Sequence, residues 1–130
     1  MNRYNPKDVT VTVDGIYLTG LGEDMITFAY DEERFTTVVG AQGDVVMNES
    51  NNHLATATLA MQATSPQYGT CLKYAKDGTV FPFWIANKSI GERCGGTHAR
   101  FKNPPEIAYG TELEDREFEV QIFDAVVEPC

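Results

Sequence analysis

The sequence predicts a mainly β domain with one short α-helix. Short segments in which apolar and polar residues alternate recur along most of the chain, as strands with one buried face require. Helical spacing of apolar residues occurs in a single stretch, 66–76. The length of 130 residues suits one domain, and no repeat, low-complexity tract or linker divides it. We therefore expect one domain over 1–130, with a polar N-terminal arm at 1–8.

The first elements are a tight hairpin and a half-buried strand. Residues 9–13 alternate valine with threonine, and Asp14-Gly15 then leads into the apolar run 16–18. An Asp-Gly pair tolerates the positive φ angles of a type I′ turn, so these residues predict a two-stranded hairpin. The stretch 25–30 places Ile26, Phe28 and Tyr30 on one face of a following strand.

The central third predicts a second hairpin and a strand with a buried face. Residues 35–39 and 45–47 are rich in β-formers, and the loop 40–44 between them contains two glycines. In 54–61 every second residue is apolar, which is strand periodicity in spite of the alanines. The residues predicted to face inward are Ala55, Ala57, Leu59 and Met61.

A short helix is predicted between Ser65-Pro66 and Gly78. The serine is a suitable N-cap, the proline suits the first helical position, and the glycine suits a left-handed helix end. The apolar positions Tyr68, Cys71, Leu72 and Ala75 recur at helical spacing. We expect this stripe to cover an open barrel end or a sheet face.

The C-terminal half predicts two more strands. Residues 80–86 form the densest apolar stretch, and Pro82 within it indicates an edge or bulged strand. In the final predicted strand, Phe118, Val120 and Ile122 alternate with polar residues. The stretch 91–101 has no clear periodicity.

The net charge argues against nucleic-acid binding. Nineteen acidic residues against ten basic ones give a formal charge of −9, whereas phosphate contacts depend on Lys and Arg. The acidic excess serves solubility, or it forms a wall past which a polyanion slides. Cys71, Cys94 and Cys130 include no C-x-x-C pair, and no apolar leader is present, so we expect a cytoplasmic compartment. No run of about 20 apolar residues predicts a membrane span.

No group of residues predicts catalysis, a cofactor or a metal. Cys94 and His98, with Cys71 as a third ligand, leave a zinc set incomplete, and Cys94 beside two glycines is explained by a turn. A cysteine–histidine pair using His53 or His98 has no local signature. Phosphate-binding loops, dinucleotide fingerprints and nucleophile elbows are missing from the sequence.

The charges are segregated along the chain. Between residues 106 and 128 there are eight acids and one base, including Glu112, Glu114 and Asp115. Between residues 88 and 102 there are four bases and one acid; the bases are Lys88, Arg93, Arg100 and Lys102. This pattern favours head-to-tail self-association through these residues. Two separately solvated faces would show the same pattern.

Several phrases of the sequence, taken in order, carry a family resemblance. They are 4–9 (YNPKDV), 35–40 (FTTVVG) with 43–45 (GDV), 54–59 (LATATL), Ser65-Pro66 and 124–127 (DAVV). With the order of elements, they resemble the inner tail tube proteins of contractile-tailed bacteriophages over essentially the whole chain. Type VI secretion and pyocin tube proteins are similar in architecture.

The resemblance implies a β-sandwich or barrel flanked by one helix, whose strands join an inner barrel shared between subunits. Such subunits assemble into hexameric rings, which stack into the tail tube of the virion and conduct DNA out of the capsid. The implied partners are other copies of the chain and the sheath, baseplate and tail terminator proteins. Assembly would take place in the bacterial cytoplasm, with DNA only as passing cargo and no membrane.

The resemblance also gives the polar strand faces a use. Alternate side chains of the shared barrel would face the channel. The candidates for the lumen are Thr56, Thr58, Glu117, Glu119 and Gln121, because the opposite faces of their strands are apolar. Two alternatives remain: a monomeric or dimeric β-sandwich binding module with an acidic face, and a small enzyme that uses Cys94, His98 or carboxylates.

Overall fold

The computed structural model describes residues 5–129, except for the side chains of residues 23 and 24. Strands dominate this part of the chain, as the sequence predicts. The elements in order are η1 (Pro6–Asp8), β1 (Val9–Val13), β2 (Ile16–Tyr17), β3 (Leu21–Tyr30), β4 (Phe35–Val39), β5 (Val45–Glu49), β6 (Ala55–Met61), α1 (Tyr68–Asp77), β7 (Phe81–Asn87), β8 (Glu92–Phe101), β9 (Arg116–Ile122) and β10 (Val126–Pro129).

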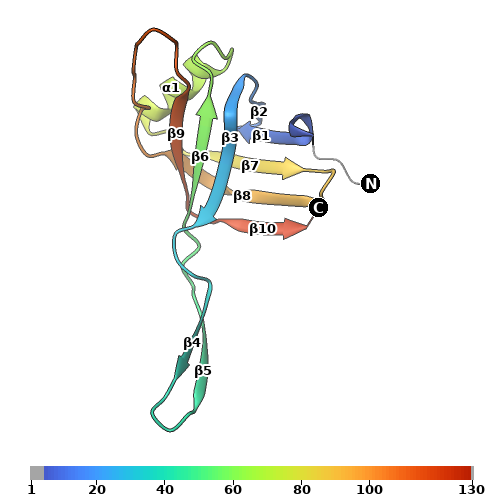
Figure 1. Cartoon of the computed structure of the whole chain (residues 1–130), viewed down its shortest axis with the longest axis vertical. Helices are drawn as coiled ribbons and strands as arrows, with labels where there is room; N and C mark the ends of the chain where they lie inside the picture. Colours follow the sequence, from blue (N-terminus) through green and yellow to red (C-terminus); the bar gives the residue numbers. More distant parts are fainter. Residues whose placement is uncertain (1–4, 130) are drawn as a thin grey trace.

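The body is one curled antiparallel sheet that folds over itself into two layers. Its strands follow the order β2-β1-β7-β8-β9-β6-β3, and β10 also pairs with β8. In Figure 1, β1, β7, β8 and β10 run across β3, β6 and β9. Strand β8 belongs to both layers, because Arg93 pairs with Glu128 of β10 near its start and Phe101 pairs with Val120 of β9 at its end. The predicted sandwich or barrel with one helix is therefore confirmed.

The core lies between the two layers and is rich in phenylalanine. Phe81, Phe83, Phe101 and Phe118 are each at most 2% exposed. The inward residues of 54–61 were also predicted correctly, because Ala55, Ala57, Leu59 and Met61 are all fully buried.

Helix α1 closes one end of the space between the layers. Cys71 and Ala75 are buried, and the Tyr74 ring stacks on Phe81 with centroids 5.8 Å apart. Gly78 ends the helix in the left-handed conformation with φ 69°, as predicted. The helix starts later than predicted, because Ser65 lies in a turn and Gln67 occupies the N-cap position.

The first hairpin turn forms as predicted, and a bulge lies at Pro82. Asp14 (φ 52°) and Gly15 (φ 79°) have the positive angles of the predicted type I′ turn. Pro82 lies at a register shift, which confirms a bulge, but β7 is an interior strand between β1 and β8 rather than an edge. Gly95 lies within β8, so the expected turn beside Cys94 was wrong.

Gly95 is needed where it lies because the main chain of Phe83 on the neighbouring strand β7 approaches it closely. Its φ is 140°, and a Cβ there would overlap the main-chain oxygen of Phe83. A larger residue would force β7 and β8 apart.

The sequence predicts 117–122 as the last strand, but the structure has one more strand after it, β10.

The predicted N-terminal arm lies partly outside the described residues, since 1–4 are not described. Of the rest, Pro6–Asp8 forms a short 3-10 helix, and the Ser89 hydroxyl donates to the Asp8 carboxylate (2.6 Å). No helix in the described residues is long and apolar enough to cross a membrane.

Candidate assembly surface

Strands β4 and β5 form a hairpin that projects far from the body (Figure 1). We call residues 35–49 the arm, as distinct from the N-terminal arm predicted at 1–8. The sequence predicts this hairpin but not its position outside the body. Every residue of both strands is exposed. Met47 (86%) and Phe35 (71%) are among the most exposed large apolar side chains of the protein.

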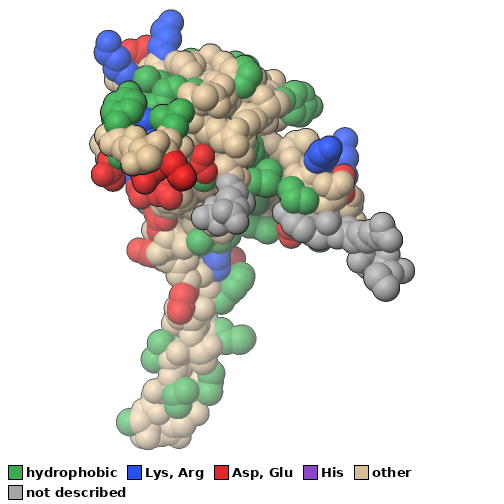
Figure 2. Space-filling model, turned by 45° about the horizontal axis from the view of Figure 1, so that its top comes forward, with side chains coloured by type: hydrophobic (Ala, Val, Ile, Leu, Met, Phe, Trp, Pro, Cys, Tyr) green, Lys and Arg blue, Asp and Glu red, His purple; other side chains and the backbone are tan. Residues whose placement is uncertain are grey.

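Apolar side chains lie on both faces of the arm. Val38 pairs with Val46, whereas the next pair, Val39 with Val45, faces the opposite way. Figure 2 shows hydrophobic side chains along the arm and acidic side chains gathered on the body. A half-buried strand alternates apolar with polar residues. Apolar residues on both faces of this hairpin were therefore the sequence signal that it packs against another surface.

Hydrogen bonds at the root of the arm hold it to the body. Arg34 donates from Nη1 to the main-chain oxygen of Asn52 (2.9 Å), and its guanidinium lies over the Tyr30 ring (5.3 Å to the centroid). The Ser50 amide donates to the Arg34 carbonyl (2.8 Å). The Asn52 side chain accepts from the Leu54 amide (3.0 Å). These contacts set the direction in which the arm leaves β3 and β6.

The five residues predicted to face a lumen lie on one face of two adjacent strands. Thr56 pairs with Gln121 and Thr58 pairs with Glu119 between β6 and β9. Glu117 follows on the same face of β9, opposite Ala60. Because Phe118, Val120 and Ile122 fill the other face of β9, this polar face points away from the core. Its exposure to a channel remains a prediction.

Two of these five residues bind Asp31 at the root of the arm. The Thr56 hydroxyl donates to Asp31 Oδ1 (2.7 Å) and the Gln121 amide donates to Oδ2 (3.2 Å). The hydrogen bond from Thr56 is the main reason that the pKa of Asp31 lies below its usual value; burial opposes it, and Lys102 adds to it. Asp31 is therefore a carboxylate at neutral pH, and Thr56 and Gln121 help to hold the arm root.

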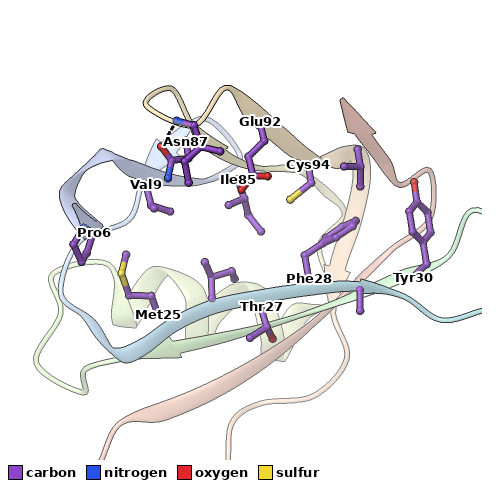
Figure 3. A pocket seen from close by; sticks show the side chains of 14 residues that line it. Pro6, Val9, Met25, Thr27, Phe28, Tyr30, Ile85, Asn87, Glu92 and Cys94 are labelled. Carbon is purple, nitrogen blue, oxygen red and sulfur yellow. Dashed lines mark hydrogen bonds between the residues drawn. The ribbon is translucent and has the colours of Figure 1, made fainter. Parts of the chain in front are cut away.

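At the end of the sandwich opposite α1, the space between the layers is open. A cavity of about 630 Å³ is lined by β3 on one side and by β1, β7, β8 and β10 on the other. We call this cavity the groove. In Figure 3, Met25, Phe28, Ile85 and Cys94 point into it, whereas Thr27 points away from it.

A bulge in β3 shapes one wall of the groove. The pairing of β3 with β6 shifts register between Leu21 and Ile26, and Met25 has a positive φ of 41°. Bulges re-aim side chains, and a non-glycine residue in this conformation carries strain that the surrounding structure must offset. The bulge therefore turns the Met25 side chain toward the groove.

Cys71 and Cys94 are the two cysteines among the described residues, and neither forms a disulfide. Burial raises the pKa of both Cys71 and Cys94 to about 11, so at neutral pH they are thiols rather than thiolates. His98 lies beside Asp124, to which its main-chain amide donates (2.9 Å). Among the described residues, no three His, Cys, Asp or Glu side chains come together as a metal site requires.

The four basic residues predicted to contact another subunit do not form one patch. Arg93 pairs with Glu128 and lies over the Trp84 ring. Lys102 lies toward the other end of β8, and its Nζ donates to the Thr56 hydroxyl (3.4 Å). Arg100 lies over the Phe123 ring (5.5 Å), and Lys88 is exposed between β7 and β8. Arg93 and Lys102 thus already have partners within the chain.

The predicted acidic contacts lie together in the segment before β9. Glu112, Glu114 and Asp115 are all exposed there. A Cβ at Gly22 would overlap the Asp115 carboxylate, so this segment packs closely on β3. The role of these acids in subunit contacts remains a prediction.

No protein-family model matches the sequence, and no curated protein is similar to it in sequence. Solved structures are similar in fold. The sheath/tube terminator of the PVC extracellular contractile injection system, in the extended state, has a TM-score of 0.62 and 10% identity, covering 98% of this chain and 98% of that one. The tube terminating cap of the anti-feeding prophage (AFP) has a TM-score of 0.61 and 10% identity, covering 100% and 93%. The chain therefore shares the fold of these two terminators over nearly its whole length.

Proposed function

We propose that this protein is a structural, non-enzymatic subunit of a contractile tail, where it forms a ring at the end of the inner tube. The observation that carries this proposal is the likeness to two tube terminators, which spans nearly all of each chain. The exposed apolar arm supports it, because a surface of this kind requires a partner.

Two kinds of tail protein have to be distinguished, the tube protein and the tube terminator. The resemblance in sequence is to tube proteins, whose rings stack repeatedly, whereas the likeness in fold is to proteins that end a tube. We favour a terminator because both solved structures are terminators. The two roles differ in behaviour, since a terminator adds once and a tube protein adds without limit.

Electron microscopy of the purified chain tests the proposal. The protein is imaged by negative stain at rising concentration, alone and mixed with tail tubes from particles of the source organism. We expect single rings with six-fold symmetry and rings at one end of the tubes. Tubes of open length would identify a tube protein instead. Monomers or dimers that ignore the tubes would favour a binding module with an acidic face.

The remaining parts of the proposal concern partners and cargo. A ring at the tube end would contact tube and sheath proteins, and assembly would occur in the bacterial cytoplasm. The baseplate lies at the other end of the tail and would not contact such a ring. In such a ring the polar face of β6 and β9 would line the channel. The carboxylates of Glu117 and Glu119, both exposed, would repel passing DNA rather than bind it.

A further inference from the structure

Beyond the contacts at its base, the arm packs against no other strand of the described residues, because β4 and β5 form a separate two-stranded sheet. An isolated two-stranded hairpin is at best marginally stable in water and needs a further strand or surface to pack on. Each strand of the arm has five residues, a length of about 17 Å, and the arm points away from the body (Figure 1). The arm therefore lies beyond the reach of the groove in the same chain.

The groove is an apolar surface beside a strand edge that has no partner among the described residues. Its lining is mainly apolar, with Ile26, Phe28 and Ile85 along its two walls. Its volume of about 630 Å³ lies within the range of cavities that enclose a ligand. Strand β3 ends the sheet order, so its outer edge beside the groove has no strand partner in the described part of the chain. The groove can therefore receive apolar side chains and hydrogen bonds from an added strand.

The distribution of charge supports a second copy of the chain as the occupant. The protein carries a net charge of −9, so most contacts between two copies would be repulsive. Little of this charge lies on the arm or in the groove. The arm has two charged residues, Asp44 in its loop and Glu49 at its base, and the only charged residue in the lining of the groove is Glu92.

We propose that the arm of one subunit docks in the groove of the next. This inference rests on the proposed ring-forming function and adds the surfaces that join the subunits. The contact is heterologous, because two different surfaces meet, and repetition of one such contact closes a ring when the rotation between copies divides a full turn. Met47 and Phe35 are the expected anchors, because their side chains are the most exposed apolar groups of the arm.

Three single substitutions test the contact without disturbing the core. Met47→Asp places a charge on the arm, and Val127→Asp places one in the wall of the groove, where Val127 is 57% exposed. Tyr17→Asp is the matched control, because Tyr17 is 67% exposed on β2 and belongs to neither surface. We expect Met47→Asp and Val127→Asp each to weaken self-association at least about tenfold by sedimentation velocity, and the control to match wild type.

Mixing the two defective variants gives the sharpest result. Met47→Asp keeps an intact groove, and Val127→Asp keeps an intact arm. A mixture can form one sound contact but cannot extend it, so we expect dimers of one copy of each variant and no rings. Native mass spectrometry identifies these dimers by the mass difference between the two chains.

Several outcomes would overturn the inference. If Met47→Asp still formed rings as wild type does, the arm would not join subunits, although the ring-forming function would stand. If Val127→Asp assembled normally while Met47→Asp did not, the arm would bind another site or another arm. If wild type stayed monomeric at every concentration yet still capped tubes, the arm would bind the tube protein, and the terminator function would again stand.

Discussion

The guanidinium of Arg34 donates a hydrogen bond from Nη1 to the main-chain oxygen of Asn52, at 2.9 Å. This bond joins the two chain segments that leave the body to form the arm. The contact of the same guanidinium with the Tyr30 ring connects it to β3. The direction of the arm therefore depends on the Arg34 guanidinium, which contacts Tyr30 at the end of β3 and Asn52 just before β6.

Loss of this cation should loosen the arm and leave the body intact. In Arg34→Gln we expect faster amide hydrogen exchange in residues 35–49 and unchanged exchange in β6 and β9. The physical reason is that the hairpin has few other contacts with the body. Arg100→Gln, which removes a charge at the far end of β8, is the control. Equal exchange in the arm of wild type and Arg34→Gln would contradict this role.

Asp124 should make stability depend on pH in the acidic range. Burial acts to raise its pKa, but hydrogen bonds from Thr97 and His98 outweigh burial and lower it below the usual value. A lowered pKa in the folded state contributes stability that is present above the unfolded value of about 3.9 and is lost as pH falls through the folded value.

Replacement of Asp124 tests this sign. Asp124→Asn should lower the free energy of unfolding at pH 7 by about 1 kcal/mol or less, because the side chain is partly exposed to solvent. The difference from wild type should narrow as pH falls below 4, as measured by urea unfolding at each pH. Asp44→Asn, in the loop of the arm, controls for net charge. A difference that stayed constant down to pH 2 would rule out the carboxylate as its cause.

Gly95 should not tolerate a side chain. Gly95→Ala is expected to reduce stability by more than about 2 kcal/mol, because the Cβ overlaps the Phe83 carbonyl and the backbone conformation is strained for any other residue. Gly110→Ala is the matched control, since a Cβ there has open space around it. Thermal unfolding of the two variants separates the effects. Similar midpoints would mean that β7 and β8 can adjust.

Charge on the polar face of β9 should decide whether the assembled ring repels DNA. Glu117→Lys with Glu119→Lys leaves the buried Phe118 and Val120 in place, so rings should still form. The variant rings should bind duplex DNA at low salt, and their affinity for DNA should fall as salt rises. Wild-type rings should not bind DNA at any salt concentration. Gel-shift assays against salt concentration measure this. Equal binding by both proteins would place these side chains away from the DNA path.

The sequence by itself determined the local structure of most of the fold. Alternating residues predicted the inward faces of β6 and β9, Asp14-Gly15 predicted the first turn, and Gly78 predicted the end of α1. These features depend on neighbours within a few residues, such as a buried strand face or a positive φ angle. They can be derived before any long-range contact is known.

Only the tertiary structure decided where those elements lie. Gly95 was expected in a turn but lies inside β8, because its requirement comes from the carbonyl of Phe83 on the neighbouring strand. The groove combines residues from β1, β3, β7, β8 and β10, and no spacing along the chain brings them together. The arm was visible in the sequence as a hairpin, but its exposure was not. Whether apolar residues such as Met47 are buried depends on what packs against them, and within the described part of the chain Met47 stays exposed.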